Sequence, residues 1–112
     1  MIIKEISKTE KKNNPHGIDT RLLYDKDEAQ AVHITLNAGE SLKPHITPVN
    51  VFFYILEGEP TILIDKEKQI VKKDCLVESP KGIPHCIYNY SNNIVRILVV
   101  KVPKPTKATK VL

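Results

Sequence analysis

Short apolar segments alternate with polar segments along most of this chain. In residues 31–36 (AVHITL), apolar side chains alternate with His33 and Thr35, and a period of two is the mark of a strand with one buried face. Residues 50–56 (NVFFYIL) are almost continuously apolar, which is typical of a strand covered on both faces. Further strands are predicted at residues 61–64, 69–71, 75–77, 85–90 and 94–102.

The segments between these strands have the composition of turns. They are NAG (37–39), EGEP (57–60), DKEK (65–68), SPKGIP (79–84) and SNN (91–93). About eight short strands at intervals of about ten residues indicate an antiparallel sandwich or barrel. The 14 Ile and 10 Val residues agree, because β-branched side chains pack well on a pleated sheet. The predicted fold class is therefore all-β, and the length of 112 residues suits one domain.

The charge of the chain lies mainly at its two ends. The first 14 residues carry a net +2 and the last ten carry +3, so of the total of +4 the body between them carries −1. A nucleic-acid-binding protein would place its basic residues on one folded face, and we therefore expect no nucleic-acid partner. No apolar run approaches the ~20 residues that span a bilayer, so we also expect no membrane partner. We expect a cytoplasmic protein whose Cys75 and Cys86 are reduced, Cys75 as a small buried hydrophobe.

Two stretches carry the most specific motifs. The first, GESLKPHITPVNVFFYILEG, runs from Gly39 to Gly58 with His45 between them. The second, DCLVESPKGIPHCIYN (74–89), has the order P-x-G-x-x-H-x-x-x-N. A rigid proline followed by a flexible glycine makes a sharp corner before a strand, and the histidine falls at the start of that strand.

Together the two stretches resemble the cupin superfamily. The first is similar to G-x5-H-x-H-x3-E-x6-G and the second to G-x5-P-x-G-x2-H-x3-N, in which the leading glycine is replaced here by Asp74. The matching residues are Gly39, His45, Gly58, Pro80, Gly82, His85 and Asn89. The resemblance implies a small double-stranded β-helix, or jelly-roll barrel, with a pocket in the barrel mouth. It places one barrel domain at residues 1–102, with an N-terminal strand and connector at 1–16, and a basic tail at 103–112.

The four metal-ligand positions of the family are only half retained in this chain. They fall on His45, Thr47, Val51 and His85, so only two strong ligands remain. A catalytic transition-metal site usually needs three protein ligands. His45 and His85 are therefore candidates for a weak site at most, for zinc, nickel, iron or manganese, and no cofactor is certain. The pocket-binding residues implied by the motif positions and strand parity are His45, Thr47, Val51, Phe53, His85 and Ile87.

Three functions remain open at this point. The first is a binding module whose apolar barrel pocket ends in His45 and His85 and holds a small organic ligand. The second is an enzyme, isomerase-, epimerase- or dioxygenase-like, that uses His45 and His85. The third is a structural or regulatory subunit with a vestigial pocket. No Ser/His/Asp nucleophile arrangement and no phosphate-binding glycine loop is present in the sequence.

The two ends of the chain carry separate expectations. The N-terminal MIIKEI is apolar enough to pair as a strand, and small cupins often dimerise through such strands, so we expect a homodimer. The polar residues 7–16 are expected to form a solvated connector. The tail PKPTKATKVL (103–112) lacks apolar periodicity, and we expect it to be solvated and dispensable for folding.

Overall fold

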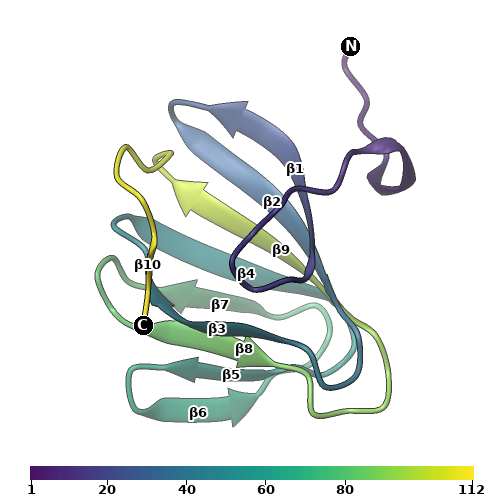
Figure 1. Cartoon of the computed structure of the whole chain (residues 1–112), viewed down its shortest axis with the longest axis vertical. Helices are drawn as coiled ribbons and strands as arrows, with labels where there is room; N and C mark the ends of the chain where they lie inside the picture. Colours follow the sequence, from purple (N-terminus) through teal and green to yellow (C-terminus); the bar gives the residue numbers. More distant parts are fainter.

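Two antiparallel five-stranded sheets face each other in the computed structural model, which describes residues 1–112 (Figure 1). One sheet has the order β1-β2-β9-β4-β7 and the other the order β10-β3-β8-β5-β6. The elements are the 3₁₀ helix η1 (Ile6–Lys8) and the strands β1 (Asp19–Lys26), β2 (Ala29–Leu36), β3 (Ser41–Ile46), β4 (Asn50–Glu57), β5 (Thr61–Ile64), β6 (Glu67–Ile70), β7 (Leu76–Ser79), β8 (His85–Tyr88), β9 (Val95–Val102) and β10 (Lys110–Val111). The predicted all-β jelly-roll architecture is confirmed. None of the helices is long and apolar enough to cross a membrane.

The core lies between the two sheets and follows the alternation along the central strands. On β9, Val95, Ile97 and Val99 are buried while their neighbours are only half buried, because successive side chains of a strand point to opposite faces. β4 pairs with β9 and alternates in the same way. Residues 50–56 were expected to be covered on both faces, but their outward side chains are only half buried. The buried hydrophobic cluster consists of Ile18, Ile34, Leu36, Leu42, Val51, Phe53, Ile55, Ile62, Ile87, Val95, Ile97 and Val99.

Three strands lack a clear pattern in the sequence. β1 contains a register shift between Leu22 and Tyr24, and β3 contains one between Leu42 and His45, around Pro44. A bulge inserts a residue and breaks the period of two, and proline removes a ladder donor. β10 spans only two residues. The strand predicted at 69–71 begins two residues earlier, at Glu67.

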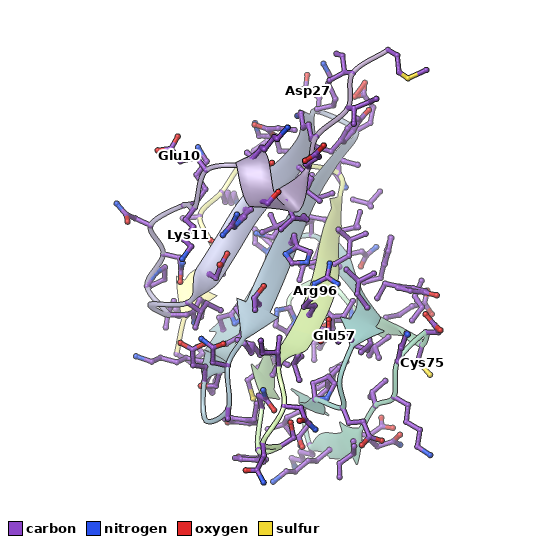
Figure 2. All side chains as sticks on the ribbon, turned by 90° about the vertical axis from the view of Figure 1, so that its right-hand side faces the viewer. Glu10, Lys11, Asp27, Glu57, Cys75 and Arg96 are labelled. Atoms are coloured by element: carbon purple, nitrogen blue, oxygen red, sulfur yellow. The ribbon has the colours of Figure 1, made fainter.

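The N-terminal segment forms no strand in this single chain. Ile2 and Ile3 are exposed, and the chain then forms η1 beside β1 (Figure 2). Arg21 of β1 holds this segment by donating from Nη1 to the backbone oxygens of Ile6 at 2.5 Å and Thr9 at 3.3 Å. The expected strand at MIIKEI is therefore not formed, and dimerisation stays a prediction.

The C-terminal tail lies against the barrel instead of extending into solvent. β10 pairs with β3, with Lys110 opposite Ile46 and Val111 opposite His45. Lys104 forms an ion pair of 2.8 Å with Asp25, and its backbone N–H donates to Asp27. The expectation of a solvated tail was therefore wrong. The contacts of the tail could not be read from its own sequence, because they depend on an edge strand that is distant in the sequence.

Gly58, at the turn after β4, is expected to tolerate no side chain. Its φ is +83°, and an added Cβ would lie 2.6 Å from the backbone oxygen of Ile94 and 2.9 Å from a methyl group of Val95. The left-handed conformation costs a non-glycine residue about 1–2 kcal/mol, and the clash with backbone adds about 1 kcal/mol or more. Gly58→Ala is therefore expected to lower the free energy of unfolding by about 2–3 kcal/mol.

Gly39 provides the matched control for this prediction. Its φ is +85°, but nothing lies within 4 Å of an added Cβ. Gly39→Ala is thus expected to cost only the conformational part, about 1–2 kcal/mol. The free energy of unfolding of both variants is measured by urea unfolding. Equal losses of stability would contradict the role of the close approach between Gly58 and residues 94–95.

Candidate functional site

A cavity of about 390 Å³ lies inside the barrel and is lined by residues of both sheets. This volume is near the lower end of the range for small-molecule pockets, ~300–1,000 Å³. Its apolar lining consists of Leu22, Val32, Ile34, Leu42, Val51, Phe53, Val99 and Val111. Thr109 and Val111 bring the C-terminal tail to the cavity as well. The cavity is therefore lined by 19 residues, of which eight are hydrophobic and most of the others are polar.

His45 and His85 meet in the wall of this cavity. They lie directly opposite each other where β3 pairs with β8. Their Nε2 atoms are 2.8 Å apart, and their rings are nearly perpendicular, with centroids 4.3 Å apart. Both side chains are buried. The two histidines identified from separate motifs are thus hydrogen-bonded partners, and we call them the histidine pair.

The hydrogen bonds around the histidine pair assign its protons. His45 Nδ1 lies 2.7 Å from the backbone oxygen of Lys43, and since a carbonyl only accepts, Nδ1 must donate. In a neutral ring His45 Nε2 is then an acceptor, so His85 Nε2 donates to it. His85 Nδ1 in turn accepts from the Ser79 hydroxyl at 2.6 Å. One chain of hydrogen bonds therefore runs from Ser79 through His85 and His45 to Lys43.

Burial keeps both rings neutral at pH 7. Burial, together with the smaller effects of the charges that His45 and Lys101 can carry, lowers the pKa of His85 to about 3. Burial also lowers the pKa of His45, against the opposing effect of its bond to Lys43. Removing a cation from water is costly, so the neutral form is favoured. Neutral imidazoles are what the assigned hydrogen-bond chain requires.

The other two motif positions lie at the same cavity. Thr47 and Val51 both line it and are buried. The Thr47 hydroxyl is buried without a hydrogen-bond partner, whereas its backbone oxygen accepts from the N–H of Gly82. Phe53 lines the cavity and packs edge-on against His85, with ring centroids 5.2 Å apart. Ile87 is fully buried in the core cluster and is not among the cavity-lining residues.

The donor set does not fit a resident transition metal. No three His, Cys, Asp or Glu side chains come together anywhere in the chain in a way that could hold a metal ion. Val51 offers no donor atom, and Thr47 offers only a neutral hydroxyl. Both Nε2 atoms of the histidine pair are engaged with each other. A site with three protein ligands is therefore not formed by these residues.

His16 is a third histidine at the cavity, which sequence reasoning missed. Its ring centroid is 5.1 Å from that of His45, and its Nδ1 accepts from the backbone N–H of Lys43 at 2.9 Å. Burial and the charge that His45 can carry lower the pKa of His16 to about 4. The bond to Nδ1 places its proton on Nε2, so this nitrogen is no metal ligand in the observed arrangement. Residues 7–16 were expected to be a solvated connector, and nothing in their polar composition marks His16.

Lys101 is the second residue that sequence reasoning missed. It lines the cavity from the end of β9 and follows Val95, Ile97 and Val99 in the inward parity of the strand. That parity was a usable signal, because a lysine at the inward position of an apolar strand is unusual. Burial lowers the pKa of the Lys101 amine.

Several other polar residues lie away from the cavity. His33 is buried in β2 and accepts from Nε of Arg96 at 3.2 Å. Asn89 bonds the backbone oxygens of Leu36 and Asn93, which fits the structure of a turn. Cys86 is buried and Cys75 is exposed (Figure 2). The expectation of a buried Cys75 was wrong, because this residue precedes β7 at the surface.

Comparison with known proteins gives the family. A family model described as "Cupin domain" matches residues 32–101. An uncharacterised protein of Methanocaldococcus jannaschii is 31% identical over 86 residues, which are 76% of this chain and 74% of that protein.

Solved structures of low sequence identity share the fold. A polyketide cyclase from Streptomyces resistomycificus has a TM-score of 0.85 at 17% identity, covering 100% of this chain and 85% of that one. A predicted oxalate decarboxylase from Thermotoga maritima has a TM-score of 0.82 at 21% identity, covering 92% of this chain and 100% of that one. The segment that the cupin family model matches, residues 32–101, contains both histidine motifs and most of the barrel strands. The chain therefore belongs to the cupin superfamily.

Proposed function

We propose that this protein binds a small organic molecule in its barrel cavity, which His45, His85 and Thr47 line. The observation that carries the proposal is the cavity of about 390 Å³, whose lining combines eight hydrophobic residues with polar ones from both sheets. The hydrophobic residues would bury the apolar part of a ligand, and the polar residues would fix its orientation.

The histidine pair gives this site a fixed and uncharged part of its wall. Its protons are placed by Ser79 at one end and by the Lys43 carbonyl at the other. Because both hydrogen-bonding ends are satisfied, the rings are held in one orientation without a metal. Phe53 against His85 adds an aromatic wall. The site is therefore preorganised, which reduces the entropy cost of binding.

An enzyme of the isomerase or epimerase type is the second candidate. The observation that favours it is the neutral imidazole nitrogen His45 Nε2 at the cavity, which accepts a hydrogen bond from His85 and has the chemistry of a general base. His45 Nε2 would take a proton from a bound molecule only after its bond to His85 is broken. Some proteins of the same fold are enzymes by their names, as the polyketide cyclase is. Turnover of a cavity-bound compound would distinguish this function from binding alone.

The proposal is tested by a ligand-observed NMR screen of a fragment library against the purified chain, together with mass spectrometry of any co-purified small molecule. We expect the screen to find fragments that bind the wild type and do not bind Val51→Phe, because the larger side chain takes up volume inside the cavity. Tyr54→Trp enlarges a side chain of the same strand on the outer face, where Tyr54 is only half buried, and should leave binding intact. Thermal unfolding checks that both variants fold. Failure to find any fragment sensitive to Val51→Phe would contradict the proposal and support a vestigial pocket.

A further inference from the structure

Lys101 places a positive charge in the cavity wall. Its strand partners are Gln30 on β2 and Val51 on β4, and Gln30 and Val51 also line the cavity. The three preceding inward residues of β9, Val95, Ile97 and Val99, belong to the core. The ammonium group thus belongs to the interior surface of the barrel and not to its outer face.

This charge has no counter-ion in the protein. The five ion pairs of the chain involve Lys8, Lys11, Arg21, Arg96 and Lys104, but not Lys101. No aspartate or glutamate is among the cavity-lining residues, whereas Lys12 is a second lysine there. A partly buried cation without a partner is unfavourable, and such groups are normally paired. The cavity therefore has an unbalanced positive charge.

The histidines around the cavity do not offset this charge. Lys101 is among the groups that lower the pKa values of His16, His45 and His85, so its charge acts on all three rings. Burial is the larger cause of the lowered pKa values, and the three rings are neutral at pH 7. They therefore do not add to the positive charge of the cavity. An anionic ligand would find the ammonium groups of Lys101 and Lys12, a neutral histidine pair and eight hydrophobic residues.

We infer that the ligand of this cavity is a small carboxylic acid with an apolar body, bound as the carboxylate with Lys101 as its counter-ion. This inference rests on the proposed function, because it assumes that the cavity binds a small molecule. A lysine pairs with an anion as a single point charge, whereas phosphate sites more often use arginine forks or several backbone N–H groups. The cavity of about 390 Å³ and its eight hydrophobic residues fit a short aliphatic or monocyclic acid.

The test uses three probes that share one apolar chain and differ only in the head group: hexanoate, hexanamide and hexylammonium. Each is titrated by NMR into the full chain at pH 7. A hydrogen bond to a charged group is typically worth a factor of about ten or more in affinity. We therefore expect hexanoate to bind at least about tenfold more tightly than hexanamide, and hexylammonium to bind least.

Variants of Lys101 test whether its positive charge causes the preference for hexanoate over hexanamide. Lys101→Met should bind hexanoate and hexanamide equally, and Lys101→Arg should keep most of the preference. Lys66→Met removes the same charge from an exposed turn outside the cavity and should behave as the wild type. Thermal unfolding checks that each variant folds.

The possible failures are distinguishable. Equal binding of hexanoate and hexanamide by the wild type would overturn the carboxylate inference and leave the proposed function standing. A preference for hexanoate that persists in Lys101→Met would overturn the role of Lys101. Absence of binding by all three probes would contradict the carboxylate inference, and the fragment screen would then decide the proposed function separately.

Discussion

Replacing Thr47 with histidine and Val51 with glutamate is expected to raise the affinity for zinc or nickel on the order of a thousandfold or more. Both residues line the cavity beside the histidine pair, at the positions where metal-binding members of the resembled superfamily have strong ligands. The double substitution would raise the number of strong protein ligands from two to four. The wild type, with two imidazoles that are bonded to each other, should bind these metals only weakly.

Ser79 allows the double variant to bind metal more tightly. When His85 gives its Nε2 lone pair to a metal, its proton must move to Nδ1. The Ser79 hydroxyl, 2.6 Å away, can then accept instead of donate, because a hydroxyl does both. Calorimetric titration of metal into chelator-treated protein measures the effect, with the two single variants as controls. Submicromolar binding by the wild type, or no gain in the double variant, would contradict this account of the site.

Acid is expected to destabilise the protein strongly through His85. Burial is the main cause that lowers its pKa from 6.5 to about 3. Between these values the unfolded chain binds the proton and the folded chain does not, so the free energy of unfolding falls as the pH falls through this window. Above pH 6.5 the contribution is fully present. Since one pKa unit corresponds to about 1.4 kcal/mol, the loss is expected to be on the order of several kcal/mol.

Urea unfolding at a series of pH values from 7 to 4 checks this expectation. His85→Gln removes the titrating group and should flatten the dependence on pH, although it lowers the stability at pH 7. His16, whose pKa burial lowers to about 4, and His45, whose pKa burial also lowers, contribute in the same direction and remain in both proteins. An equal pH dependence in the wild type and His85→Gln would show that His85 is not the group responsible.

The all-β class could be predicted from local signals, and the jelly-roll barrel and the meeting of His45 and His85 from the resemblance of two short motifs to the cupin superfamily. The alternation in 31–36 and the corner formed by Pro80 and Gly82 are properties of neighbouring residues. Asp74, which replaces a motif glycine, has a φ of +66°, a conformation that aspartate tolerates better than most residues. The motif thus preserves backbone conformations, and the fold follows even where the metal ligands are absent.

The rest of the site depends on contacts between distant segments. His16 reaches the cavity because a polar connector folds back and accepts a hydrogen bond from Lys43. The tail reaches it because β10 adds to the edge of β3. Neither contact has a periodicity that could be seen in the sequence. Lys101 differs from these two segments, because its place at an inward position of β9 can be read from the sequence. Only its lack of a counter-ion could not be known without the structure.

¹⁵N NMR of the imidazole rings measures the protonation of the histidine pair. At pH 7, we expect two neutral rings of opposite tautomer: His45 protonated at Nδ1, by its bond to the Lys43 carbonyl, and His85 protonated at Nε2, by its bond to His45. The spectrum should not change after treatment with a chelator. Two rings of the same tautomer, a charged ring, or a chelator-dependent spectrum would contradict the metal-free, hydrogen-bonded pair.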